Sequence, residues 1–137
     1  MVKKVTTSNT YTYAIGRRKA AVATVKLFAG KGESTVNKMS AEKYFPGKTA
    51  QIAYERPFAV TETSGKYHFQ AKLVGGGKAG QVEALSLSIC RALVKINESF
   101  KAVIKPTGLL TVDSRVKERR MVGTGGKSRR QKQSPKR

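Results

Sequence analysis

The clearest candidate for chemistry in this chain is a glycine-rich segment, residues 75–80, with the sequence GGGKAG. It fits the pattern G-x-G-x-x-G, in which glycines let the backbone approach a pyrophosphate at the N-terminus of a helix. The context also fits, because an alternating apolar stretch precedes the segment and a helical pattern follows it. Two other interpretations stay open. The segment could be a simple strand-to-helix turn, or it could hold RNA phosphates through free backbone N–H groups and the Lys78 ammonium.

The nucleotide interpretation lacks the rest of its fold. A dinucleotide site needs a second parallel strand after the helix, with an acidic residue at its end for the ribose. Glu98 lies at about the right distance, but it falls at the expected end of the helix, and only 33 residues follow Ile104. A P-loop is excluded because Gln81 and Val82 occupy the positions of its Lys and Ser/Thr. We therefore expect no cofactor and no small-molecule substrate.

Other side chains that could do chemistry are sparse. His68 is the only histidine, Cys90 is the only cysteine, and the eight carboxylates are scattered. One cysteine allows no internal disulfide, and the spacing offers neither a metal cluster nor a Cys–His catalytic pair. We expect Cys90 to pack within a helix, His68 to lie on the polar face of a strand, and Glu83 to balance Lys78 or Lys95. The residues do not indicate an enzyme.

The charge balance indicates a polyanionic partner. The 137 residues include 28 Lys and Arg against 8 Asp and Glu, for a net charge of +20, and 39% are hydrophobic. So high a charge on so small a chain favours nucleic acid as the partner, ahead of an anionic membrane surface. No stretch approaches the ~20 apolar residues of a membrane span, and the first ten residues lack the apolar core of a signal peptide.

The positive charge is concentrated toward the end of the sequence. Residues 1–112 hold 18 basic and 6 acidic residues, whereas residues 113–137 hold 10 basic and 2 acidic ones. From Arg119 onward there is no acidic residue, and the only sizeable apolar ones are Met121 and Val122. Such a stretch cannot bury enough surface to offset the entropy of ordering. We predict a flexible segment 1–10, a globular domain 11–113 and an extended basic tail 114–137.

Hydrophobic periodicity predicts the elements that would position these residues. Alternation over 21–28 and 67–74 predicts two strands, and Ala21, Ala23, Val25 and Leu27 share one face of the first. Apolar residues recur at helical spacing from Val82 and predict a long helix ending near Asn97. Weaker patterns predict short strands at 34–36, 57–62 and 109–112 and short helices at 40–45, 49–54 and 100–104, with Ser40 and Thr49 as caps. This order predicts an α+β fold with helices on one face of a sheet.

Several segments together resemble the family of small-subunit ribosomal protein nine. The run 75–81, followed by Ala84 and the segment 91–93 (RAL), is similar to the family signature. Segments similar to other parts of the family occur in the same order: 13–19 (YAIGRRK), 44–45 (YF), 113–123, 127–130 (KSRR) and 136–137 (KR). The resemblance extends over about residues 11–137.

The resemblance implies a fold and a function. The fold would be a two-layer sandwich similar to the second domain of ribosomal protein five, with a left-handed crossover and a long extended basic C-terminal tail. The chain would be a non-enzymatic constituent of the small ribosomal subunit, located in the cytoplasmic ribosome, with an organellar ribosome also open. Its partners would be small-subunit ribosomal RNA, neighbouring proteins of the subunit head, and peptidyl-site transfer RNA. A free-standing basic nucleic-acid-binding protein is the alternative.

The resemblance also assigns RNA-contacting positions. Lys136 and Arg137 are expected to contact transfer RNA. The chain departs from the family pattern at residues 131, 132, 134 and 135, so no aromatic stacking is expected from Ser134. No metal ligands are expected. The expected ribosomal-RNA contacts are Arg17, Arg18, Lys19, Gly75, Gly76, Gly77, Lys78, Arg115, Arg119, Arg120, Lys127, Arg129, Arg130 and Lys132.

Overall fold

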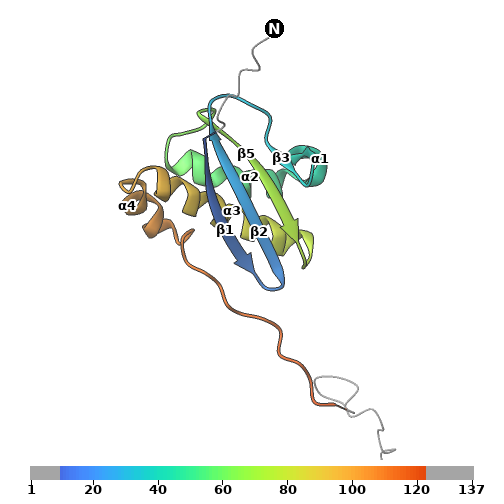
Figure 1. Ribbon diagram of the computed structural model, residues 1–137. Coiled ribbons are helices and arrows are strands. Elements are labelled where there is room, and N and C mark those ends of the chain that lie inside the picture. The colour runs from blue at the N-terminus through green and yellow to red at the C-terminus, as the bar shows by residue number, and fades with distance from the viewer. Residues whose placement is uncertain (1–9, 123–137) are drawn as a thin grey trace, which may run out of the picture.

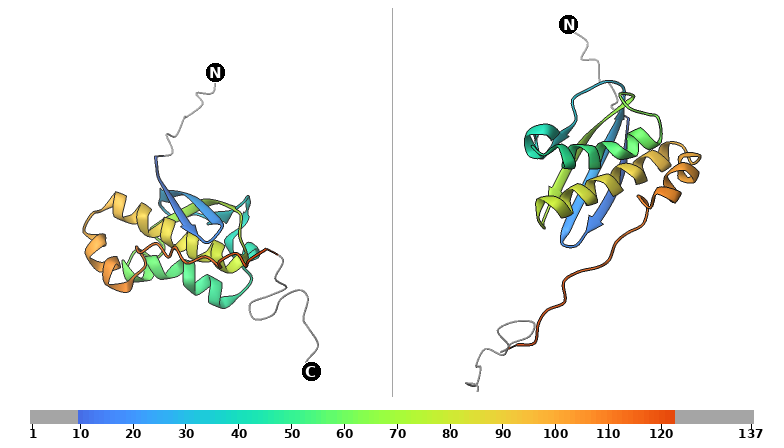
Figure 2. Two further views of the ribbon diagram at one scale, coloured as in Figure 1. Left: turned by 90° about the horizontal axis from the view of Figure 1, so that it is seen from below. Right: turned by 180° about the vertical axis from the view of Figure 1, so that it is seen from behind.

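The computed structural model describes residues 10–122, in which one mixed sheet packs against helices on a single face (Figures 1 and 2). The predicted α+β class is confirmed. The strands are β1 (Tyr11–Arg18), β2 (Ala21–Ala29), β3 (Thr35–Val36), β4 (Met39–Ser40) and β5 (Tyr67–Val74). The helices are α1 (Ala41–Tyr44), α2 (Lys48–Val60), α3 (Lys78–Ile96), α4 (Phe100–Ile104) and the 3₁₀ turn η1 (Lys105–Thr107). The segments 1–9 and 123–137 lie outside the described residues. The predicted flexible segment 1–10 and the end of the predicted tail 114–137 therefore fall largely outside the described structure.

The strand order in the sheet is β1-β2-β5-β3-β4. All neighbouring strands are antiparallel except β3, which runs parallel to β5. Asn37 continues this short parallel pairing beyond β3. Its backbone N–H donates to Ala71 O at 2.9 Å, and its side-chain amide exchanges two hydrogen bonds with the backbone of Leu73, at 2.9 and 3.1 Å. Asn tolerates the positive φ of 48° that this geometry requires.

The core lies between the sheet and the helices, on the faces that the alternation predicts. Ala21, Ala23, Val25 and Leu27 of β2 are all buried, as are Phe69, Ala71 and Leu73 of β5. Leu85, Ile89 and Leu93 of α3 are completely buried against them. Burial of side chains of this size contributes roughly 1.5–3 kcal/mol each, so these two strands and one helix supply much of the folding free energy.

Among the described glycines, Gly16 makes the closest backbone approach, and it joins β1 to α3. A Cβ atom on Gly16 would overlap the carbonyl oxygen of Ala84 and lie 2.7 Å from the backbone nitrogen of Ser88. Two cations of α3 then cover the outer carbonyls of this edge strand, because Arg91 donates to Ile15 O and Lys95 donates to Tyr13 O, both at 2.7 Å. Covering an edge strand in this way blocks unwanted strand pairing.

One predicted element and two predicted caps are wrong in the region of α1 and α2. Residues 57–62 do not form a strand, because α2 continues through Pro57 to Val60. Pro57 falls in the last turns, where the loss of one helical hydrogen bond is offset by burial of Pro57 and Phe58 in the core. The predicted helix at 49–54 is present as part of α2, but its N-cap is Gly47 rather than Thr49. Ser40 does precede α1, but its side chain makes no capping hydrogen bond.

The predicted strand at 109–112 is also wrong, since this segment forms turns and a bend. Leu109 and Leu110 nevertheless pack against the core. The apolar residues in this segment therefore indicate burial and not a strand. The predicted strands at 34–36 and 67–74, the long helix from Val82 to near Asn97 and the short helix at 100–104 are confirmed within a few residues. Among the described residues, no helix is long and apolar enough to cross a membrane.

The close approach of α3 to β1 at Gly16 can be tested by adding a single methyl group. We expect Gly16→Ala to lower the free energy of unfolding by about 3 kcal/mol, because both nearest atoms belong to the backbone of α3 and the helix must shift. Gly80→Ala is the matched control within α3, since its Cβ would sit 3.5 Å from the nearest atom and alanine favours helix. Urea unfolding should show opposite signs for the two variants. Equal stabilities would contradict this account of the α3–β1 contact.

Candidate nucleic-acid interface

The glycine loop between β5 and α3 is shaped by the turn that joins β1 to β2. Gly75 and Gly76 have φ angles of 74° and 64°, which favour glycine. A Cβ on Gly75 would lie 2.5 Å from Ala20 O, and one on Gly76 would lie 3.0 Å from the backbone and Cβ of Ala21. These two glycines are therefore required by the fold itself. A Cβ on Gly77 would meet nothing within 4 Å, and all three glycines are exposed ahead of the α3 N-terminus.

Lys78 holds this loop against α1. Its ammonium donates to Tyr44 O at 2.9 Å and lies 3.4 Å from the centroid of the Tyr44 ring. Gln81 supports the same corner, because it accepts from the Tyr44 hydroxyl at 2.9 Å and donates to Gly75 O at 3.0 Å. An ammonium has three donors, so the exposed Lys78 keeps further donors for a phosphate while it fixes the loop.

The three adjacent cations at the end of β1 have different surroundings. Arg17 and Lys19 are exposed, and within residues 10–122 neither side chain makes a hydrogen bond or ion pair. Only 11% of the Arg18 side chain is exposed. It pairs with Glu83 at 2.5 Å and with Asp113 at 3.3 Å, and it donates to Arg115 O at 2.9 Å. Arg18 thus fastens the segment after η1 to α3.

The partner of Glu83 corrects the sequence-based prediction. Lys78 and Lys95 were expected to balance this carboxylate, but both ammonium groups donate to backbone carbonyls instead. Arg18 takes their place from 65 residues away in the sequence. Helical spacing finds neighbours on one helix only, so it could not have found a partner on β1.

Arg18, Glu83, Asp113 and Arg115 together form what we call the Arg18 cluster. Asp113 and Arg115 lie on its exposed side. The Arg115 guanidinium contacts the Asp113 carboxylate at 2.6 and 2.9 Å, and the Arg115 backbone N–H donates to it at 3.0 Å. Hydrogen bonds from Arg115 hold the pKa of Asp113 well below its ordinary value. The pKa of Asp113 is therefore lower in the folded state than in the unfolded state. The contribution of this ion pair to folding stability is complete above the unfolded-state pKa of about 4, and it is lost as the pH falls through the folded-state pKa.

These contacts bring three expected RNA-binding segments to one end of the sheet. The loop at 75–77 lies against the β1–β2 turn, Arg17–Lys19 lead into that turn, and Arg115 lies beside Arg18. Figure 1 shows the chain leaving the fold from this end. Arg119 and Arg120 follow in exposed chain without helix or strand. Lys127, Arg129, Arg130, Lys132, Lys136 and Arg137 lie outside the described residues. This basic end, comprising residues 17–19, 75–78 and 115, is the candidate interface.

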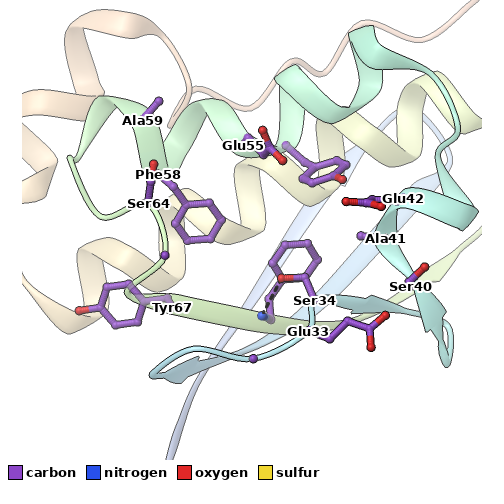
Figure 3. A pocket seen from close by; sticks show the side chains of 14 residues that line it. Glu33, Ser34, Ser40, Ala41, Glu42, Glu55, Phe58, Ala59, Ser64 and Tyr67 are labelled. Carbon is purple, nitrogen blue, oxygen red and sulfur yellow. Dashed lines mark hydrogen bonds between the residues drawn. The ribbon is translucent and has the colours of Figure 1, made fainter.

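Carboxylates gather elsewhere, around a pocket of about 590 Å³ between α1, α2 and β5 (Figure 3). Glu33, Glu42 and Glu55 line it, three of the eight acidic residues in the chain. Tyr54 and Phe58 also line it. Burial, followed by the charges of Glu55 and Glu42, raises the pKa of the Tyr54 hydroxyl. These carboxylates would repel phosphate, so the pocket is not part of the candidate RNA interface at the basic end.

Comparison with known sequences decides the family. A family model described as ribosomal protein S9/S16 matches residues 16–137. The chain belongs to this family. It is 44% identical over 119 residues to the small ribosomal subunit protein uS9 of Maridesulfovibrio salexigens, which covers 87% of this chain and 92% of that protein. It is 40% identical over 116 residues to uS9 of Lawsonia intracellularis, covering 85% and 89% respectively.

Membership of the S9/S16 family confirms the resemblance found in the sequence and makes the chain a structural, non-enzymatic protein of the small ribosomal subunit. The environment of its one thiol agrees with this, because burial raises the pKa of Cys90 to about 12. Such a thiol stays protonated and is a poor nucleophile. Within residues 10–122, no group of three or more His, Cys, Asp or Glu could hold a metal ion.

Some surface cations of this S9/S16 chain escaped the sequence-based site assignment. Lys26 and Lys72 point outward from β2 and β5, on the sheet face away from the helices. The signal was present in the same alternation that predicts the buried face, since every second residue must lie on the other side.

The Arg18 cluster predicts how tightly the segment after η1 is held. We expect Arg18→Gln to speed tryptic cleavage after Arg115 and Lys117 by roughly tenfold, because a charge-assisted hydrogen-bond set worth about 1.5 kcal/mol or more is lost. Arg56→Gln is the control, since it removes an exposed arginine whose side chain makes no hydrogen bond or ion pair within the described chain. Mass spectrometry of timed digests gives the rates. Equal rates for both variants would show that Arg18 does not fasten this segment.

Proposed function

We propose that this chain binds the ribosomal RNA of the small-subunit head through its basic end, and that its C-terminal residues contact transfer RNA at the peptidyl site. One observation carries the first part. The exposed glycine loop, the cations of the β1–β2 turn and the start of the basic C-terminal segment lie at one end of the sheet. Neighbouring ribosomal proteins of the head are the further partners.

Each part of the basic end has a distinct role in this proposal. Gly77 and the first turn of α3 present backbone N–H groups, which favour an anion at a helix N-terminus. Arg17, Lys19 and Lys78 neutralise phosphates, and Arg115 can fork two phosphate oxygens. Arg18 is largely buried in its protein contacts, so it acts mainly by positioning Arg115.

The tail part of the proposal rests on the sequence and the family. From Arg119 to Arg137 there are 19 residues, with eight basic side chains and no acidic one. Extended at ~3.3 Å per residue, they span roughly 60 Å, enough to reach a site far from the fold. A basic chain can run between crowded RNA strands because it neutralises their phosphates and releases counterions. Lys136 and Arg137 then contact transfer RNA, and Lys127, Arg129, Arg130 and Lys132 contact ribosomal RNA.

The finer description of the fold is part of the same proposal. We infer a division into segment 1–10, domain 11–113 and extended tail 114–137, and a similarity to the second domain of ribosomal protein five. The left-handed crossover is the link from β3 through α2 to the parallel strand β5. It is supported by the direction of these strands and by α2 lying behind the sheet in Figure 1. The expected location is the cytoplasmic ribosome.

A sedimentation experiment separates a ribosomal role from that of a free-standing RNA binder. The tagged chain should co-migrate with small subunits in a sucrose gradient and should stay with them after a wash in moderate salt. A free-standing nucleic-acid binder would instead spread through the gradient and leave the subunits as salt rises, because nonspecific binding is mainly electrostatic. That distribution would overturn the ribosomal assignment for this chain.

The transfer RNA contact is tested at the last two residues. We expect Lys136→Gln/Arg137→Gln to leave the chain in the subunit but to weaken transfer RNA retention at the peptidyl site several-fold, since two phosphate contacts are lost. Lys101→Gln/Lys105→Gln removes the same charge from α4 and η1 and should have no effect. Filter binding of labelled transfer RNA to purified subunits gives the comparison. If both double variants behave alike, the last two residues have no specific role there.

A further inference from the structure

The face of the sheet turned away from α2 and α3 carries one continuous set of side chains. The register places these residues in rows across β1, β2 and β5. Strand alternation puts them all on the same side of the sheet. Figure 1 looks onto this face, with the helices behind it. Its members are Tyr11, Tyr13, Ile15 and Arg17 from β1, Val22, Thr24, Lys26 and Phe28 from β2, and His68, Gln70, Lys72 and Val74 from β5.

One edge of this open face is aromatic. Phe28 lies between Tyr11, at a ring-centroid distance of 5.6 Å, and His68, at 5.3 Å with the two planes only 13° apart. Tyr11 is 46% exposed, and Tyr13, in the next row of the sheet, is 44% exposed. The described helices lie on the other face of the sheet (Figure 2). The rings of Tyr11 and Tyr13 are therefore available to stack on a partner.

The middle of the face is cationic. Lys26 and Lys72 flank a shallow cavity of about 660 Å³, together with Lys38 at the β3–β4 turn. Within the described chain, these three ammonium groups make no hydrogen bond or salt bridge, although Lys26 lies 4.8 Å from the Tyr11 ring centroid. No carboxylate lines the cavity or belongs to the open face. Since this face carries cations without carboxylates, and three of the eight acidic residues line the pocket of Figure 3 instead, the face is complementary to a polyanion.

Amide and hydroxyl groups surround these cations. Gln70, Thr24 and Thr35 line the same cavity, and such groups can hydrogen-bond base edges or sugar hydroxyls. A duplex would leave the tyrosine rings without bases to stack on, because the bases of A-form RNA are stacked inside the helix and only phosphates and the shallow minor groove are accessible. Unpaired nucleotides fit, since their bases can stack on aromatic rings while their phosphates meet lysines.

We infer that the open face of the sheet is a second RNA-binding surface, which takes unpaired nucleotides by stacking bases on Tyr11 and Tyr13 and holding phosphates with Lys26 and Lys72. The inference rests on the proposed ribosomal-RNA partner but uses a surface distinct from the basic end. The aromatic rings and the cations make separate contributions. Stacking is largely independent of salt, whereas the phosphate contacts weaken steeply as salt rises.

This difference provides the test in solution. The full chain is titrated with a fluorescein-labelled oligouridine of about ten nucleotides over a range of salt concentrations. Tyr11→Ala/Tyr13→Ala should weaken binding by about tenfold or more at every salt concentration, high salt included, where the basic tail contributes least. Lys26→Gln/Lys72→Gln should instead lower the salt slope by about 1.4, from ~0.7 per phosphate of single-stranded RNA.

Matched variants exclude general effects. Tyr11→Phe/Tyr13→Phe keeps the rings and should bind like the unaltered chain. Lys101→Gln/Lys105→Gln removes equal charge from the helical side and should leave the slope unchanged. Thermal melts check that each variant folds, which is expected because both tyrosines are half exposed. If the alanine and phenylalanine pairs bind equally well, the stacking surface does not exist.

The assembled subunit supplies an independent test. Ultraviolet irradiation of small subunits should crosslink Tyr11 or Tyr13 to unpaired ribosomal RNA, as detected by mass spectrometry. Lysine-specific crosslinking that joins Lys26 and Lys72 to a neighbouring protein would instead show that a protein covers the face, and it would overturn the inference. In both of those outcomes the chain still co-migrates with the subunit. Failure to co-migrate would overturn the proposed ribosomal function itself, so the two failures are distinguishable.

Discussion

The fold depends on how closely the backbone of α3 can approach β1. Only glycine at position 16 permits that approach, since any Cβ there would overlap the Ala84 carbonyl. The approach fixes the helix along the edge strand. It thereby places Arg91 and Lys95 on the strand's free carbonyls and Glu83 beside Arg18. It also sets the N-terminus of α3 against the β1–β2 turn, where the glycine loop must pass. One missing side chain therefore determines both the packing of the core and the geometry of the basic end.

So basic a chain must also limit repulsion among its own cations, and the structure does so selectively. Some cations are committed to protein contacts: Arg18 to carboxylates, and Lys78, Arg91 and Lys95 to backbone carbonyls. A carbonyl dipole neutralises little charge, but it orients an ammonium group without placing a carboxylate on the surface. Carboxylates are thereby kept away from the basic end and from the open sheet face, except at the Arg18 cluster. Both surfaces retain the net positive potential that association with RNA requires.

The sequence predicts the elements of this fold better than it predicts their partners. Alternation located β2 and β5 and chose their buried faces correctly, because every second residue must share a side. It failed at Pro57, where burial in the core outweighs the lost hydrogen bond, and at 109–112, where apolar residues pack without forming a strand. The sequence predicts a turn or an RNA contact at the glycine loop, but it does not predict the contact of this loop with Ala20. The roles of Arg18 and Lys78 likewise depend on residues distant in the sequence, which periodicity within one element does not reveal.

The Arg18 cluster connects the fold to what its basic tail is proposed to do. A long charged chain loses much conformational entropy when it is held along RNA, and that loss opposes binding. Arg18 and Asp113 hold the base of this chain at a defined place on the fold, beside the glycine loop. A chain that already leaves in one direction samples fewer orientations when free, so it loses less entropy when it binds. In the proposed function, the largely buried arginine therefore contributes through geometry, whereas its exposed neighbours Arg17 and Lys19 contribute through charge.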